Sequence, residues 1–164
     1  MPQDPEDNPG FLLWHVTLHW QRDIAAALGP LDLTHAQFVL LASIWWLNRG
    51  GETPNQLAVA RHAGTDVKMT SQVLRRLEDK GLIRRETDPA DTRAKRLQVT
   101  DSGARVAEHA VTVVEDVDRA FFAATPDPAA LAGLLRPLMG IGDRPGPPAP
   151  TEHPGTAPSP RDRH

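Results

Sequence analysis

The sequence predicts a mainly α-helical protein with one small β-hairpin. Three features within residues 53–100 lead to this prediction: a helical apolar stripe, a shorter helix just before it, and two short strands just after it. Two short helices joined by a tight turn and followed by a hairpin form a winged helix-turn-helix. Apolar helical patterns flank this stretch on both sides, so we expect a winged helix-turn-helix with flanking dimerisation helices.

The central helix is predicted over residues 66–81. Apolar or small side chains recur at the i, i+3, i+4, i+7 spacing of one helix face, at Thr70, Val73, Leu74 and Leu77. Asp66 suits the start of this helix and Gly81 suits its end. The opposite face carries side chains that reach base edges and phosphates in a DNA major groove, namely Lys68, Ser71, Gln72 and Arg75. The pattern predicts a recognition helix; taken alone, it also fits an ordinary solvated amphipathic helix.

The neighbouring segments favour the recognition helix. Thr53 and Gln56 have the spacing of a capping box, with Pro54 at the first helical position, so a short helix is expected to begin there. Residues 63–65 form a tight turn into the recognition helix. Residues 82–86 and 96–100 are predicted strands, and the polar loop 87–95 suits the tip of a hairpin.

Three runs in this region resemble the MarR family of bacterial transcriptional regulators: Leu77 to Arg85, Asp88-Pro89-x-Asp91-x-Arg93-Ala94-Lys95, and Val99 to Gly103. The resemblance extends over residues 11–139. It implies a homodimer on a pseudo-palindromic operator, with a reader head at residues 34–100 and dimerisation helices at residues 11–28 and 101–139. Arg93 would enter the minor groove, held by Asp91. Phosphate contacts are expected from Arg84, Arg85, Lys95 and Arg96.

The flanking helices have clear boundaries in the sequence. The first is expected over residues 11–28, and the second begins with a capping box of Thr34 and Gln37. A long helix should follow a Thr100 cap and run to residue 124. A last helix should begin at Thr125-Pro126, with Pro137 bending or fraying it. These apolar faces exceed what one small core needs, which favours a symmetric dimer, although the helices could instead pack within one chain.

Composition narrows the class of protein. The 164 residues carry a net charge of −3, but residues 61–105 contain eleven basic and seven acidic residues, so one surface is basic. Cysteine is absent, which excludes disulfides and cysteine nucleophiles. We expect a cytoplasmic protein with no membrane segment, no cofactor and no enzyme activity, because no phosphate-binding Gly loop, nucleophile elbow or carboxylate pair is present. Disordered tails are expected at residues 1–10 and 141–164.

A ligand response is also expected, because the resemblance implies that a small aromatic or phenolic anion binds between the dimerisation helices and the reader head. The residues predicted to line that pocket are Trp14, His15, His19 and Phe38. His15 and His19 share a helix face and could hold a metal, but Val16 follows the first histidine, so the metalloprotease motif is absent. Two alternatives to specific DNA binding stay open: a protein-interaction module, and a small-molecule-binding protein without a DNA role.

Overall fold

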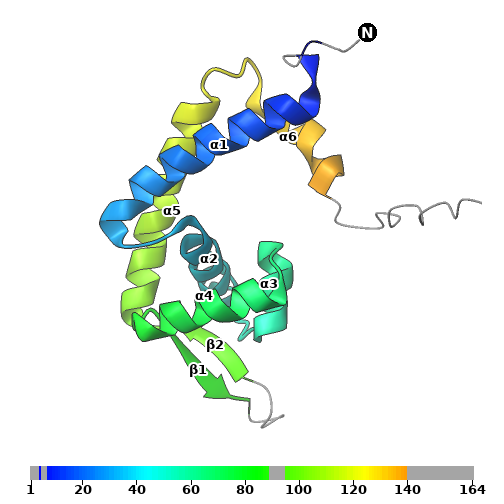
Figure 1. Ribbon diagram of the computed structural model, residues 1–164. Coiled ribbons are helices and arrows are strands. Elements are labelled where there is room, and N and C mark those ends of the chain that lie inside the picture. The colour runs from blue at the N-terminus through cyan, green and yellow to red at the C-terminus, as the bar shows by residue number, and fades with distance from the viewer. Residues whose placement is uncertain (1–3, 5–6, 89–94, 140–164) are drawn as a thin grey trace, which may run out of the picture. The chain divides into compact units, whose positions relative to one another are not determined.

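The computed structural model describes residues 4, 7–88 and 95–139 of the chain (Figure 1). The chain divides into two compact units, residues 1–124 and 125–164. The first unit contains, in order, α1 (Pro9–Leu28), η2 (Gly29–Leu31), α2 (His35–Arg49), α3 (Gln56–Ala63), α4 (Val67–Asp79), β1 (Ile83–Thr87), β2 (Lys95–Val99) and α5 (Asp101–Phe122). The predicted fold class, mainly helical with one hairpin, is confirmed.

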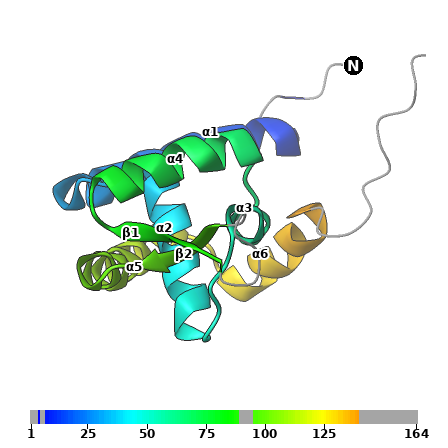
Figure 2. The same ribbon diagram turned by 90° about the horizontal axis from the view of Figure 1, so that it is seen from below.

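In the first unit, the long helices α1, α2 and α5 pack together and support the smaller elements. α1 packs against α5, and α2 packs against both α5 and α4. β1 and β2 are antiparallel, with a register that runs from Ile83↔Val99 to Thr87↔Lys95. Viewed from below, α4 and the hairpin lie on the near side of this unit, in front of α2 (Figure 2). The two elements predicted to meet DNA therefore lie on one side.

A single hydrophobic core joins the long helices to the helix-turn-helix. Its fully buried members come from six elements and include Ile24, Leu40, Val59, Leu74, Leu97 and Ala110. Burying one aliphatic side chain of this kind stabilises the fold by about 1.5–3 kcal/mol. Because α4 contributes its apolar stripe to the core shared with α1 and α5, its position depends on how those helices are packed.

Four helix ends form as the sequence predicts. Thr34 and Gln37 make the reciprocal capping box of α2. The side chains of Asp66 and Thr100 accept backbone hydrogen bonds at the starts of α4 and α5. Gly81, with a φ of 68°, follows the Lys80 cap and stops α4. The amides of Gly81 and Leu82 donate to the carbonyls of Glu78 and Leu77, which closes the helix in a Schellman motif.

In the first unit, two predicted helix starts are wrong, each because a better cap is present. α1 begins at Pro9 instead of Phe11, since the Asn8 side chain accepts bonds from Gly10 and Phe11. α3 begins at Gln56, with Asn55 as its cap, rather than at Pro54. The carbonyl of Pro54 accepts from Leu97 N, and Asn55 forms a bridge with Arg96. Pairing with β2 thus keeps residues 54 and 55 extended.

The predicted strands are each displaced by one residue. Leu82 belongs to the closing turn of α4, so β1 begins at Ile83 and ends at Thr87. Thr100 caps α5, so β2 ends at Val99 and begins at Lys95. The helix caps therefore determine where the strands begin and end.

The second unit contains α6 (Pro128–Leu135) and η3 (Arg136–Met139). The prediction of a helix start at Thr125-Pro126 is wrong, because Asp127 caps α6 and accepts from Ala130 N at 3.0 Å. The change from α-helix to 3-10 helix at Arg136 accompanies Pro137, which cannot donate an amide hydrogen. Of the tails predicted at residues 1–10 and 141–164, residues 1–3, 5–6 and 141–164 lie outside the described residues. Pro9 and Gly10 belong to α1, so the predicted N-terminal tail extends too far.

No single helix within residues 7–88 and 95–139 is long and apolar enough to cross a membrane. Among the described residues, one pair of segments, α1 with η2 and α2, is together long and apolar enough for a membrane span, but the pair is bent by 71°. α2 supplies five buried residues to the protein, which is typical of a central core helix.

Candidate nucleic-acid interface

α3, a short turn and α4 form a helix-turn-helix held by side-chain hydrogen bonds. Gly64 ends α3 in the left-handed conformation, and the side chain of Thr65 lies 2.7 Å from that of Thr70. Thr70 Oγ1 also donates to the Asp66 carbonyl at 2.7 Å. Gln56 Nε2 donates to the Val67 carbonyl at 3.3 Å, linking α3 to the start of α4. The angle between the two helices is thereby fixed at both sides of the turn.

The outer face of α4 carries the predicted base-reading side chains. Lys68, Gln72 and Arg75 are exposed, and Ser71 is half-buried. The inner face is formed by Thr70, Leu74 and Leu77, which are fully buried. The structure thus brings all four predicted side chains to the accessible part of one helix, as major-groove contact requires.

Sequence reasoning missed one residue of this surface. Val67 is the first residue of α4 and is 51% exposed. The first turn of a recognition helix contacts base edges, and an apolar side chain there can contact a thymine methyl group. An apolar residue directly after the helix cap was the signal in the sequence.

The four hairpin residues predicted to contact phosphates lie on both faces of the hairpin, two on each face. The register places Arg84 and Arg96 on one face and Arg85 and Lys95 on the other. Ion pairs join Arg84 to Glu86 at 2.7 Å, Arg85 to Glu78 at 3.1 Å and Arg96 to Asp88 at 2.8 Å. Lys95 donates to Thr87 Oγ1 at 2.8 Å. These contacts hold the basic side chains in place. That the four side chains bind DNA phosphates stays a prediction. Asp91 and Arg93 lie outside the described residues.

A pocket of ≈ 570 Å³ lies where α1 and α2 meet the helix-turn-helix. It is lined by Gln21, His35, Ala36, Val39, Ala63, Thr65 and Met69. The His35 ring makes an edge contact with Trp20, with ring centroids 5.1 Å apart, and Trp20 Nε1 donates to Asp118 Oδ1 at 2.7 Å. Burial lowers the pKa of His35, and the Asp118 carboxylate partly opposes this effect. A neutral imidazole therefore faces a cavity of the size that suits a small ring compound.

The residues predicted to bind an effector lie apart from most of this pocket. Phe38 stacks on His35, with ring centroids 6.4 Å apart. Trp14, His15 and His19 are exposed on α1 and do not line the pocket. Their role as effector ligands stays a prediction. Within the described residues, no group of three or more His, Cys, Asp or Glu side chains is placed to hold a metal ion.

The arrangement defines a winged helix-turn-helix DNA-binding protein. The MarR family model matches residues 33–95. An HTH-type transcriptional regulator of Bacillus subtilis is 45% identical over 120 residues, covering 73% of this chain and 82% of the relative. An HTH-type transcriptional repressor of Mycobacterium tuberculosis is 32% identical over 116 residues, covering 69% and 79%. The chain belongs to the MarR family and is a DNA-binding transcriptional regulator, not an enzyme.

Two solved structures share this fold. BpsR of Bordetella bronchiseptica, described with the regulation of its DNA binding by 6-hydroxynicotinic acid, has a TM-score of 0.75 and 25% identity. That similarity covers 87% of this chain and 100% of BpsR. A mutant MarR from E. coli complexed with operator DNA has a TM-score of 0.69 and 27% identity, covering 79% of this chain and 91% of that protein.

Proposed function

We propose that this regulator is a homodimeric repressor that binds a pseudo-palindromic operator and releases it when a small organic anion or phenol binds. The exposed face of α4 carries this proposal: Lys68, Ser71, Gln72 and Arg75 read the major groove while the other face is fixed in the core. Arg84, Arg85, Lys95 and Arg96 contact phosphates. The repressor named among the relatives and the operator complex of a structural neighbour support this function.

The N-terminal half of α1 supports the proposed dimer. Six of its large apolar side chains are between 38% and 62% exposed: Phe11, Leu12, Leu13, Trp14, Val16 and Leu18. Only Ile24 and Leu28, near its other end, are buried. Four of them are consecutive, so this part of α1 is apolar around the whole helix. An exposed apolar segment of this kind indicates an interface, and a second copy of the chain is the occupant that gives two reader heads for two half-sites.

Light scattering at micromolar concentration should give the mass of a dimer. On DNA from upstream of the protein's own coding region, a footprint should show two half-sites about one helical turn apart, roughly 10 bp. A monomeric mass would exclude the dimer. Binding to every duplex with equal affinity would instead favour a protein-interaction module that uses the winged helix as a docking surface.

The His35 pocket supports the proposed ligand response. It touches α1, α2 and the turn before α4, so a ligand there contacts both the long helices and the helix-turn-helix. The neutral imidazole and the Gln21 amide can hydrogen-bond a carboxylate or hydroxyl group, while Val39 and Met69 contact a ring. A ligand releases DNA only if it binds the released conformation more tightly.

Aromatic carboxylates, with 6-hydroxynicotinic acid among them, should quench tryptophan fluorescence and weaken operator binding, because Trp20 contacts His35. His35→Ala should weaken this response by about tenfold and leave DNA binding without ligand unchanged. His109→Ala, which alters an exposed histidine on α5, is the matched control. An unaltered response in His35→Ala would exclude this pocket, and a screen without any responding compound would contradict the ligand response.

A further inference from the structure

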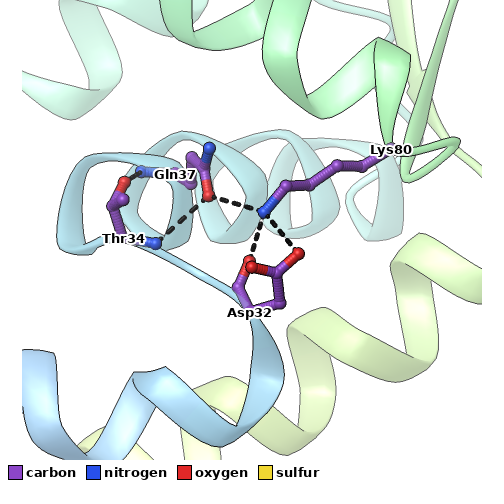
Figure 3. A network of polar contacts seen from close by, with 4 residues as sticks. All are labelled: Asp32, Thr34, Gln37 and Lys80. Atoms are coloured by element: carbon purple, nitrogen blue, oxygen red, sulfur yellow. Dashed lines mark hydrogen bonds and ion pairs between the residues drawn. The ribbon is translucent and has the colours of Figure 1, made fainter.

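The C-terminal end of α4 is attached to the corner between α1 and α2 by one lysine. Lys80 follows the last residue of α4, and its ammonium group reaches the corner formed by residues 29–33 (Figure 3). Lys80 Nζ lies 3.0 Å from Asp32 Oδ2 and donates to the Asp32 carbonyl oxygen. It also donates to Gln37 Oε1 at 3.2 Å. One ammonium group thus meets three acceptors that belong to the α1–α2 segment.

The acceptors around Lys80 are themselves held in place. Gln37 is only 8% exposed, and its Oε1 also accepts the Thr34 amide at 3.1 Å in the capping box of α2. Asp32 has φ 52° and ψ 40°, which makes it the one non-glycine residue with positive φ in the described part of the chain. This sparsely populated conformation turns the Asp32 carbonyl oxygen toward Lys80, and such conformations persist only where surrounding contacts support them.

The contact is more than a surface ion pair. The Asp32 side chain is 92% exposed, so its attraction to Lys80 is screened by water and contributes little. The Lys80 side chain is only 28% exposed, and its other two acceptors are a backbone carbonyl and a buried amide. Because the exposed carboxylate is screened by water, the bonds to the carbonyl and to the buried amide contribute most of this contact, and the charge on Lys80 strengthens each of them.

The other polar side-chain contacts of α4 connect it to different parts of the fold. Within the described residues, they run to the turn before it, to α3 through Gln56, and to β1 through Arg85. Among these polar links of the described residues, Lys80 alone joins α4 to the corner that continues into α1, the helix whose N-terminal half is apolar and exposed. A shift of α1 relative to α2 would therefore act on α4 through Asp32 and Lys80.

We infer that Lys80 is a positioning residue that sets the angle of the recognition helix relative to α1, and hence the spacing between the two reader heads. This inference rests on the proposed dimer. Lys80 does so by fixing the C-terminal end of α4 to the corner, without contacting DNA. Its removal leaves α4 anchored by its apolar stripe and by its links to α3 and β1, but no longer attached to the corner between α1 and α2.

The test measures operator affinity with half-sites at the natural spacing and at spacings changed by one base pair. The natural protein should discriminate between these operators by about tenfold, and Lys80→Met should reduce this ratio to about twofold. The salt dependence of binding should stay unchanged, because no phosphate contact is lost. Arg76→Met removes the same charge from the last turn of α4 and should keep the tenfold ratio.

Asp32→Gly provides a second variant that preserves the fold, because glycine adopts positive φ without strain. It removes the carboxylate and loosens the corner. Its spacing ratio, meaning operator affinity at the natural half-site spacing divided by affinity at a changed spacing, should fall between those of the natural protein and Lys80→Met. Spacing ratios equal to that of the natural protein in both variants, with folded dimers by light scattering, would overturn the inference. So would a salt slope lowered by about one unit in Lys80→Met, which indicates a phosphate contact. If the natural protein ignored spacing, the proposed dimeric function would fail instead.

Discussion

Gly103→Ala should lower the midpoint of thermal unfolding by roughly 10 °C, equivalent to a loss of about 3 kcal/mol in the free energy of unfolding. A Cβ atom on Gly103 would lie 1.8 Å from the backbone oxygen of Leu82 and 2.7 Å from its carbonyl carbon. Both are backbone atoms, so no side-chain rotation relieves the clash. Either the start of α5 or the end of α4 must move.

Hydrogen bonds on both sides of this contact oppose such a movement. The amide of Leu82 donates to the Leu77 carbonyl at 3.0 Å, and the Leu82 carbonyl accepts the Thr100 amide at 3.0 Å. The Gly103 amide itself donates to Thr100 Oγ1 at 3.0 Å. Separating α5 from Leu82 would break the cap of α5 and disturb the junction between α4 and β1.

Scanning calorimetry at matched protein concentration measures this effect. Gly133→Ala in α6 is the control, because a Cβ atom there meets nothing within 4 Å. Alanine is favoured over glycine inside a helix by about 1 kcal/mol, so the control should unfold at the same or a higher temperature. A midpoint for Gly103→Ala equal to that of the natural protein would show that the contact with Leu82 relaxes without cost.

Gln72→Ala should weaken binding to the operator by about 1–3 kcal/mol while leaving binding to a scrambled duplex unchanged. Gln72 is neutral and exposed on the outer face of α4. Its amide can form two hydrogen bonds to an adenine edge but makes no charge contact with phosphates. Arg75→Ala should lose a similar amount on the operator and should also weaken non-specific binding.

Lys95→Ala provides the contrast. Lys95 is exposed on β2, and a phosphate contact there should strengthen binding to all duplexes alike. Its removal should lower the salt slope of binding by roughly one unit without changing the ratio between operator and scrambled DNA. Fluorescence anisotropy at two salt concentrations distinguishes the variants. If Gln72→Ala kept the natural ratio, α4 would not be the recognition helix.

The sequence by itself determined the elements whose signals are local. The stripe of Thr70, Leu74 and Leu77 repeats at helical spacing, and the caps Asp66 and Thr100 bond to amides three residues away. Such contacts depend on residue order alone, so the helices and the outward side chains Lys68, Gln72 and Arg75 could be predicted. The MarR motifs around the hairpin identified the family on the same basis.

Only the tertiary structure decided contacts between distant residues. Asn55 replaced Thr53 as the cap of α3 because Pro54 and Asn55 pair with β2. Lys80 meets Asp32 across 48 positions, and Trp20 meets Asp118 across 98. Many charged residues could pair equally well on chemical grounds, and helix packing selects which of them come within a few ångströms. The His35 pocket and the attachment of α4 to the α1–α2 corner follow from that packing, which no local pattern specifies.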